Sequence, residues 1–284
     1  MTKKEILEKL KFDLETRGRT DDTVRTYCMH ARLFQDYFDK PADEMGEDEM
    51  SAYLHYLLKE KQLSPASVNS HNSTLRFLYG VTLDRIINTK KIPRVKHNRS
   101  IPVLPTKEEL GYLLYLAGGD LRNKALFYTI YGSGLRSGEA ANLKVGDIDS
   151  ENGRIFIRKG KGGRDRYVLL PKKTLEVLRE YWTEYQPKDW LFINKDGNKM
   201  TVNSIRSAWK TIVKRSGIPK DINVHTLRHL FATHLLNYGN NVFAIKHLLG
   251  HVRIDTTTWY LQLADSDTLK LKSPLDRMKE RADA

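Results

Sequence analysis

The chain has 284 residues, enough for two domains, and carries 48 Lys and Arg residues against 35 Asp and Glu residues. The net charge of +13 favours a polyanionic partner such as nucleic acid, because contacts with phosphates release counterions. The single cysteine, Cys28, excludes an intrachain disulfide and a cysteine metal cluster. The charged N-terminus lacks a signal-peptide core and no apolar run approaches the roughly 20 residues of a membrane span, so we expect a cytoplasmic protein with no membrane partner.

Residues 1–88 predict an all-helical domain. Apolar residues at helical spacing predict helices over Lys3–Arg17 and Glu47–Lys59, and Thr20 or Asp21 can cap a further helix between them.

A fourth helix is predicted to begin at Ser64 and Pro65, an N-cap followed by proline at the first helical position, and to run to Tyr79. Its exposed face would be short and polar, with amides and a guanidinium that suit phosphates or base edges. The candidate DNA-binding residues on this face are Asn69, Asn72 and Arg76. An ordinary solvated face explains the same pattern equally well.

A basic linker is predicted over residues 89–105. No acidic residue occurs between Asp84 and Glu108, and three prolines interrupt the stretch. A free linker does not require such a bias of charge, so we interpret it as a segment that lies along a DNA backbone. The basic residues expected to bind DNA are Lys90, Lys91, Arg94, Lys96 and Arg99.

Residues 106–284 predict a second domain. A capping box at Thr106 opens a helix that runs to Ala117, and another helix ends in the glycine-rich stretch around Arg136. Glu139 follows Arg136 by three residues, close enough to orient its guanidinium. A nucleotide-binding loop is excluded because no G-K-[ST] motif and no preceding strand are present.

A β-hairpin is predicted from strands at Arg154–Arg158 and Tyr167–Leu170, joined by a glycine-rich turn. Lys161 lies at or near its tip, where a mobile amine can reach a DNA groove, although Lys159 and Arg164 occupy the same turn. With further helices at Leu175–Tyr185 and Val202–Ser216, the predicted fold class is mainly α with a small β-hairpin or sheet.

The stretch from Asn223 to Leu261 carries His225, Arg228, His251 and Tyr260 among apolar helical segments. A guanidinium holds two phosphate oxygens in a fork, imidazoles add donors, and a phenol can attack phosphorus. Each residue also has an ordinary interpretation: the histidines as structural residues or zinc ligands, the tyrosine as a core residue. We interpret His229, His234 and His247 as structural.

Five motifs in this order resemble those of the tyrosine site-specific recombinases, the phage-integrase-like family that includes the Xer, Cre and integron integrase groups. The resemblance covers most of residues 106–262, and the N-terminal helices are similar to the family's core-binding domain more loosely. The motifs are G-L-R-S-G-E at Gly134–Glu139, G-K-G-G-R-D-R at Gly160–Arg166, H-T-L-R-H-L-F-A-T-H-L-L at His225–Leu236, L-G-H at Leu249–His251 and T-T-T-W-Y at Thr256–Tyr260.

The resemblance implies a two-domain, C-shaped clamp in which a helical core DNA-binding domain, residues 1–88, joins a mixed α+β catalytic domain, residues 106–284. It implies that Arg136 and Arg228 clamp the non-bridging oxygens of the scissile phosphate and stabilise charge in the transition state. His225 would position the phosphate and assist proton transfer, and His251 would donate a hydrogen bond to it. Glu139 would support Arg136 without touching the DNA.

Tyr260 would attack phosphorus, forming a 3′-phosphotyrosyl link and releasing a 5′-hydroxyl, while Lys161 would protonate the departing oxygen. This chemistry needs fixed positive charge, because a free phenol has a pKa near 10 and is a poor nucleophile at neutral pH. The phosphotyrosyl bond resembles the broken diester in energy. We therefore expect neither a metal, ATP nor another cofactor.

The partners implied are double-stranded DNA with inverted-repeat core sites and a homotetramer on two such sites that proceeds through a Holliday junction. Accessory DNA-bound subunits are a further expectation, as is a protomer-docking tail at residues 265–284. A type IB topoisomerase and a non-catalytic DNA-binding accessory factor are the alternatives. Within the family we expect a Xer-type dimer resolver or a transposon-borne resolvase or integrase, with a mobile element favoured.

Overall fold

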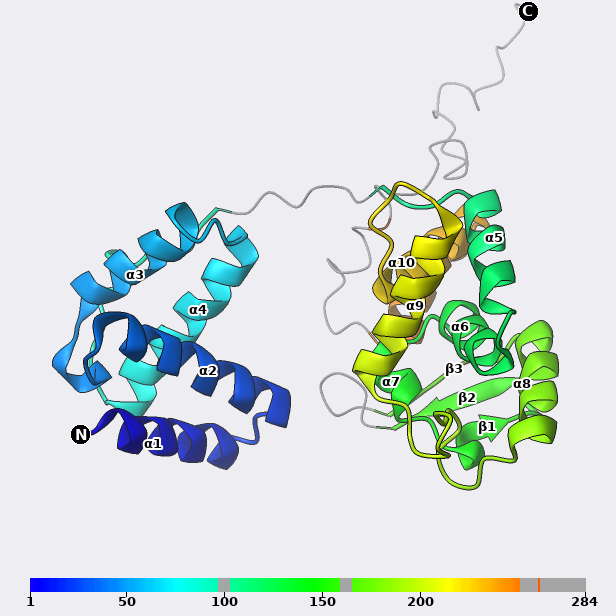
Figure 1. Cartoon of the computed structure of the whole chain (residues 1–284), viewed down its shortest axis with the longest axis horizontal. Helices are drawn as coiled ribbons and strands as arrows, with labels where there is room; N and C mark the ends of the chain where they lie inside the picture. The colour runs from blue at the N-terminus through cyan, green and yellow to red at the C-terminus, as the bar shows by residue number, and fades with distance from the viewer. Residues whose placement is uncertain (97–102, 159–164, 251–259, 261–284) are drawn as a thin grey trace, which may run out of the picture. The chain divides into compact units, whose positions relative to one another are not determined.

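The computed structural model describes residues 1–96, 103–158, 165–250 and Tyr260. Within these residues the chain is mainly helical and has one small antiparallel sheet, which confirms the predicted fold class (Figure 1). The chain divides into two compact units, Met1–Ser100 and Ile101–Ala284, and each has its own hydrophobic core. No helix in the described part of the chain is long and apolar enough to cross a membrane.

The helices of the first unit begin where their capping residues predict. The side chains of Thr2, Thr20 and Ser64 each accept a hydrogen bond from the backbone N–H three residues further on, which satisfies a donor that the helix itself leaves unpaired. The elements are α1 (Lys3–Thr16), α2 (Asp21–Phe38), the short 3₁₀ helix η1 (Ala42–Glu44), α3 (Glu47–Lys59), α4 (Pro65–Phe77) and the π-helical turn η2 (Leu78–Thr82).

The polar face of α4 differs from the sequence prediction. Asn72 is only 1% exposed, and its amide donates to the carbonyl of Ile92. Asn69 both donates to and accepts from the backbone of Val95, and Arg76 donates to the carbonyl of Ile92. The predicted exposure of Asn72 is therefore wrong. The segment after η2 has no sheet partner, so α4 side chains satisfy its backbone groups instead.

The predicted basic linker begins packed against the first unit. Ile92 belongs to that unit's core, and Arg94 donates to the hydroxyl of Ser73 on α4. The basic side chains around Ile92 nevertheless remain at the surface. Those exposed in the described part of the linker are Lys90, Lys91, Arg94 and Lys96, whereas Arg99 lies outside the described residues.

The second unit contains most of the elements predicted from the sequence, together with a short helix and a short strand that were not predicted. Its helices are α5 (Lys107–Ala117), α6 (Leu121–Ser133), α7 (Ser137–Ala141), the 3₁₀ helix η3 (Val145–Asp147), α8 (Lys172–Tyr185), α9 (Val202–Ser216), α10 (Val224–Asn237) and α11 (Val242–Leu249). The unpredicted helix, α7, is too short to show a hydrophobic period.

The sheet of the second unit has the strand order β1-β2-β3, all antiparallel. Strands β2 (Arg154–Ile157) and β3 (Arg166–Leu169) form the predicted hairpin, with Ile155 paired to Val168 and both side chains buried. The added strand, β1 (Ile148–Asp149), pairs with β2. The side chain of Asp149 also pairs with that of Arg154, which fixes this short edge.

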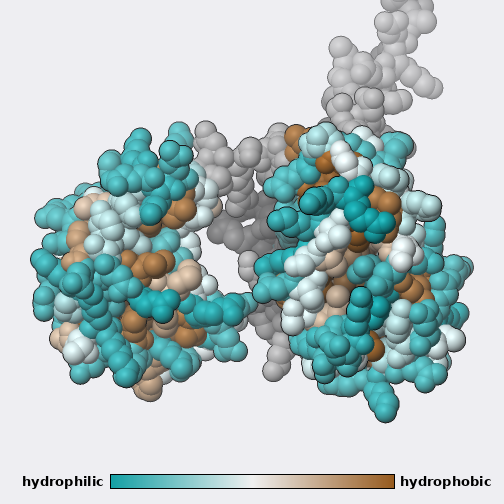
Figure 2. All heavy atoms as spheres, in the orientation of Figure 1, coloured by the Kyte–Doolittle hydropathy of each residue, from teal (hydrophilic) through white to brown (hydrophobic). Residues whose placement is uncertain are grey.

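Helix α6 lies at the centre of the second unit, packed against α5, α8 and α10. Its middle is fully buried, and it ends at Gly134 in a left-handed conformation with φ +64°. The chain then turns sharply and α7 begins after Arg136. The face drawn in Figure 2 is mainly hydrophilic, with smaller hydrophobic areas on both units. The turn after α6 brings the polar segment that begins α7 against helix α10.

Candidate active site

Arg136 and Glu139 form an ion pair at the start of α7. The Glu139 carboxylate accepts a hydrogen bond from the Arg136 backbone N–H at 2.9 Å and another from Arg136 Nη1 at 2.7 Å. The two residues are three apart in sequence, and the capping geometry of this short helix folds one back on the other. The guanidinium is thereby held in one orientation, with part of it still exposed.

Arg166 is a buried member of the site that the sequence analysis did not single out. It begins β3, and its two Nη atoms donate to the two Glu139 oxygens at 3.0 and 2.9 Å. Its Nε donates to the carbonyl of Leu248 near the end of α11. Arg166 was visible in the sequence only as the last letter of the G-K-G-G-R-D-R motif. It connects the hairpin to α7 and α11.

Arg228 is completely buried on α10. Its Nη1 donates to the carbonyl of Gly134 at 2.7 Å and its Nη2 to the carbonyl of Leu249 at 2.6 Å, while Nη1 lies 3.7 Å from Glu139. Burial lowers the pKa of Arg228 to about 10, so the side chain remains charged at neutral pH. Carbonyls at the ends of α6 and α11 thus both bind this guanidinium.

Arg136, Arg166 and Arg228 surround the carboxylate of Glu139, and we call these four residues the arginine cluster. Burial raises the pKa of Glu139, but the hydrogen bonds and positive charges of Arg166 and Arg136 outweigh burial and bring it to about 2. Three positive charges therefore meet one negative charge, which leaves two positive charges unbalanced in the cluster. Such a surplus stabilises a phosphate that gains negative charge during attack.

Tyr260 lies beside the arginine cluster and is 2% exposed. Its ring packs in a small apolar group that includes Phe231, Ile245 and Leu249. Its phenol oxygen lies 3.1 Å from Nδ1 of His229. Burial raises the pKa of Tyr260, while the charge of Arg228 and a hydrogen bond from it act in the opposite direction. At neutral pH the phenol therefore retains its proton.

His225 and His229 lie one helical turn apart on α10, with ring centroids 4.6 Å apart. Desolvation and the nearby charge of Arg228 lower the pKa of His229 to about 4. The pKa of His225 is also lowered to about 4, by desolvation, by His229 and by the charges of Arg228 and Arg136. Both rings are therefore neutral at pH 7. We interpreted His229 as structural from the sequence, but the structure places it against Tyr260. Its spacing of four residues from His225 was a signal that could have identified it.

The structure thus brings together five of the residues predicted for the catalytic site. They are Arg136, Glu139, His225, Arg228 and Tyr260. Lys161 and His251 lie outside the described residues. Asn69, Asn72, Arg76 and the basic segment belong to the other compact unit. Among the described residues, no group of three His, Cys, Asp or Glu side chains is arranged to hold a metal ion.

Comparison with known proteins identifies the class to which this chain belongs. Residues 106–267 match the phage integrase family, and residues 6–89 match the N-terminal SAM-like domain of phage integrases. The chain is 34% identical over 279 residues to a putative integrase/recombinase, y4qK, of Sinorhizobium fredii, with 98% of this chain and 90% of that protein covered. It is 30% identical over 283 residues to tyrosine recombinase XerA of Pyrococcus horikoshii, with 97% and 94% covered.

A solved structure extends the comparison to three dimensions. The XerH site-specific recombinase bound to its difH substrate, in a pre-cleavage complex, is 26% identical and has a TM-score of 0.66, with 88% of this chain and 80% of that chain covered. The chain therefore belongs to the phage integrase family and is a tyrosine site-specific recombinase. It is an enzyme that cleaves and rejoins DNA strands.

Proposed function

We propose that the arginine cluster and Tyr260 are the strand-cleavage site of this recombinase. In this proposal Arg136 and Arg228 hold the non-bridging oxygens of the scissile phosphate, and Tyr260 is the nucleophile. The observation that carries the proposal is the position of Arg228, which contacts both Glu139 and the Tyr260 phenol. A guanidinium in this position can hold a phosphate within reach of the attacking oxygen.

The proposed reaction transfers a phosphodiester from DNA to the protein and back. The Tyr260 oxygen forms a bond to phosphorus as the bond from phosphorus to the 5′ oxygen breaks, which leaves a 3′-phosphotyrosyl link and a 5′-hydroxyl. Religation is the reverse attack by a 5′-hydroxyl. Because one diester replaces another, the bond energy is conserved in the covalent link.

We assign protonation of the leaving 5′ oxygen to Lys161 and a hydrogen bond to the phosphate to His251. These two assignments rest on the motifs, since both residues lie outside the described part of the chain. A 5′ alkoxide is a poor leaving group, so an acid at this position is worth about 10²- to 10⁴-fold in rate. His225 is assigned to positioning of the phosphate from its place beside Arg228 on α10.

We further propose that residues 1–88 bind DNA as a core-binding domain, that residues 89–105 follow the DNA backbone and that residues 106–284 form the catalytic domain. The exposed side chains of Lys90, Lys91, Arg94 and Lys96 support this role for the segment. Asn69 and Arg76 support it indirectly, because they hold that segment in place. The DNA substrate implies that the enzyme works in the cytoplasm.

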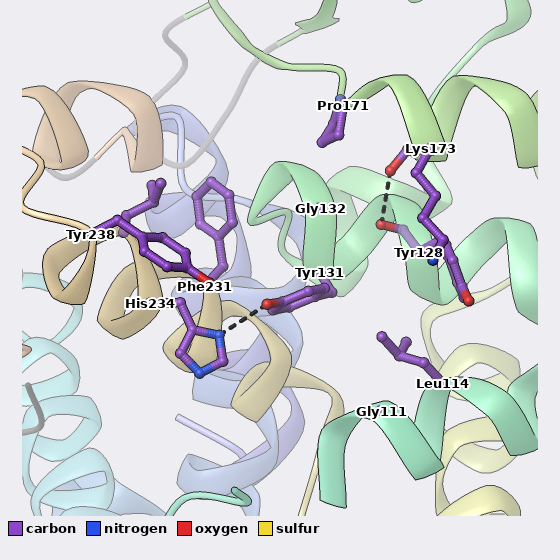
Figure 3. Close-up of a pocket in the computed structure, with 12 residues that line it drawn as sticks. Gly111, Leu114, Tyr128, Tyr131, Gly132, Pro171, Lys173, Phe231, His234 and Tyr238 are labelled. Carbon is purple, nitrogen blue, oxygen red and sulfur yellow. Dashed lines mark hydrogen bonds between the residues drawn. The ribbon is translucent and has the colours of Figure 1, made fainter. Parts of the chain in front are cut away.

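The proposed assembly is a homotetramer on two DNA sites with inverted-repeat cores. A pocket of about 460 Å³ in the second unit is a suitable acceptor for a neighbouring chain (Figure 3). Its lining is largely apolar and includes Leu114, Pro171, Phe231, Leu235 and Tyr238. The tail, residues 265–284, carries Leu269, Leu271, Leu275 and Met278 and lies outside the described residues. We propose that the tail of one protomer fills this pocket in the next.

For the biological role we propose recombination on behalf of a mobile element, either integration or the resolution of a cointegrate. The similarity to a putative integrase/recombinase over almost the full chain supports this role. Resolution of chromosome dimers, a Xer-type role, is the alternative that the similarity to XerA supports. For both biological roles we propose that accessory DNA-bound subunits take part.

The test of the proposed site is covalent trapping on DNA. Labelled and nicked fragments of the DNA that flanks the gene are incubated with the protein without metal or ATP and run on a denaturing gel. We expect a protein–DNA adduct that disappears in Tyr260→Phe, while that variant still binds the fragments. The labelled fragment that forms the adduct locates the target site.

Two other outcomes would contradict parts of the proposal. An adduct that persists in Tyr260→Phe would mean that another tyrosine is the nucleophile. Relaxation of supercoiled DNA that lacks the target site, at the rate seen with the site, would favour a topoisomerase-like activity over site-specific exchange.

A further inference from the structure

Among the described residues, Arg228 and His229 both make polar contacts with the phenol of Tyr260. Arg228 makes a hydrogen bond with it, and Nδ1 of His229 lies 3.1 Å from the same oxygen. A guanidinium has donors and no acceptor, so the phenol oxygen accepts the bond from Arg228. With the His229 proton on Nε2, the phenol O–H donates to Nδ1 of His229 while the phenol oxygen accepts from Arg228.

The surroundings of His229 keep its ring in the state that can accept a proton. The charged and titratable groups around the pair, among the described residues, are His225 and Arg228 on the same helix and Arg136 and Glu139 on α7. Desolvation and the charge of Arg228 lower the pKa of His229 to about 4, so its ring is neutral at neutral pH. Tyr260 is 2% exposed within its apolar group, and its contact with His229 is partly buried.

We propose that His229 is a catalytic residue that accepts the Tyr260 proton through Nδ1 during attack on the phosphate. This inference rests on the proposed role of Tyr260 as the nucleophile. It assigns a second proton site to the reaction, separate from the acid that serves the 5′ oxygen.

The proton balance of the proposed step is complete within the site. As the Tyr260 oxygen bonds to phosphorus, its proton moves to Nδ1 of His229, and the 5′ oxygen leaves with a proton from Lys161. Neutral His229 becomes a cation next to the negative charge that develops on the phosphate, which offsets its unfavourable position beside Arg228. In religation the imidazolium returns the proton to the phenol.

Two variants separate the proton transfer from simple positioning. His229→Asn places a carbonyl oxygen close to the former Nδ1, so it can accept the phenol's hydrogen bond but cannot take its proton. His229→Leu removes both abilities. The matched control is His247→Asn, because His247 is exposed on α11 and lies outside both the arginine cluster and the pocket of Figure 3.

The measurement is the single-turnover rate of adduct formation on the nicked DNA fragments, with DNA affinity measured separately. We expect both His229 variants to bind DNA normally and to cleave it about 100-fold or more slowly at pH 7, with His247→Asn unaffected. The wild-type rate should be nearly constant around neutral pH. In the His229 variants the rate should rise steadily with pH, because hydroxide must then remove the phenol proton.

A second substrate distinguishes the two proton sites. Replacing the 5′ bridging oxygen with sulfur gives a leaving group that needs no proton, so it should rescue Lys161→Ala but neither His229 variant. Wild-type cleavage by His229→Asn, or rescue of His229→Leu by the sulfur substrate, would overturn the proposal. An adduct that survives in Tyr260→Phe would instead overturn the proposed site, and the two failures are therefore distinguishable.

Discussion

At the scale of single residues, the site depends on close approach between Gly134 and α10. Gly134 has a left-handed conformation with φ +64°, and a Cβ placed on it would lie 2.3 Å from the ring of Phe231. Phe231 is buried, so its ring has little room to move. The Gly134 carbonyl also accepts a hydrogen bond from Arg228, and Arg136 follows two residues later. One small residue thus allows two arginines to approach the same carboxylate.

We predict that Gly134→Ala destabilises the second unit by about 2–5 kcal/mol and strongly reduces cleavage. The left-handed conformation costs an alanine about 1–2 kcal/mol, and overpacking against Phe231 adds about 1–3 kcal/mol. The measurement is urea unfolding followed by tryptophan fluorescence, together with the adduct assay. Displacement of Arg228 and Arg136 should reduce the rate even where the protein remains folded.

Gly217→Ala is the matched control for this prediction. Gly217 has φ +68° and ends α9, but no heavy atom lies within 4 Å of a Cβ placed on it. It should show only the conformational cost and normal cleavage. Equal destabilisation of the two variants would mean that the Phe231 ring yields to the added methyl group, and the packing argument would then be wrong.

At the scale of secondary-structure elements, α2 and α4 are joined by a buried pair of histidines. The rings of His30 and His71 stack with centroids 3.6 Å apart, and His30 Nδ1 lies 3.2 Å from the hydroxyl of Thr74. Desolvation lowers the pKa of His30, and desolvation together with His30 lowers the pKa of His71 to about 4. The folded unit therefore holds both rings in their neutral form.

We predict that the first unit loses stability as the pH falls from about 6.5 toward 4. A histidine whose pKa is lower in the folded state binds its proton mainly when unfolded, so its neutral form stabilises the fold above the unfolded pKa and this advantage is lost below it. For His71 the loss is on the order of 2 kcal/mol at pH 5. His71→Phe should reduce the loss between pH 7.5 and pH 5.

Hydrogen exchange of residues 65–82 at the two pH values measures this effect. Tryptophan fluorescence does not report on the first unit, because every tryptophan lies in the second unit. Tryptophan fluorescence then serves as an internal control that His71→Phe should leave unchanged. His55→Gln is the matched variant, since His55 is exposed on α3. A pH response of His71→Phe as large as that of the wild type would assign the acid sensitivity to other groups.

At the scale of the whole molecule, the proposed tetramer depends on the tail and on the pocket of Figure 3. We predict that removal of residues 265–284 leaves binding to a single DNA site intact and weakens pairing of two sites at least about tenfold, a change of about 1.4 kcal/mol. Tyr238→Glu should have the same effect, because it puts a charge at the pocket where the apolar tail would dock. Sedimentation velocity on DNA with one or two target sites gives both quantities.

Trp182→Glu is the control for the pocket variant. Trp182 is a half-exposed aromatic residue on α8 and lines a different pocket of about 440 Å³. It should leave pairing unchanged. Intact tetramers of the truncated protein would contradict the docking proposal, and equal loss in the Tyr238 and Trp182 variants would show that the effect is not specific to this pocket.

Much of the fold was predictable because its signals are local. The capping residues Thr20, Ser64 and Thr106 mark helix starts that the structure confirms, and the pattern around Ile155 and Val168 predicted the hairpin. Helix α7 and strand β1 were missed because neither is long enough to show a period. The prediction that Asn72 is exposed was wrong because its hydrogen-bond partner, the Ile92 carbonyl, is 20 residues away in the sequence.

The sequence by itself determined the family, and it predicted the residues of the proposed site, because the motifs around Arg136, Arg228 and Tyr260 follow the family's order along the chain. Tertiary structure decided which groups meet. Arg166 reaches Glu139 across 27 residues and His229 reaches Tyr260 across 31, through contacts between elements that no local pattern records. The charge balance and the hydrogen bonds of the site depend on these distances, so they are set only when the helices and the hairpin pack together.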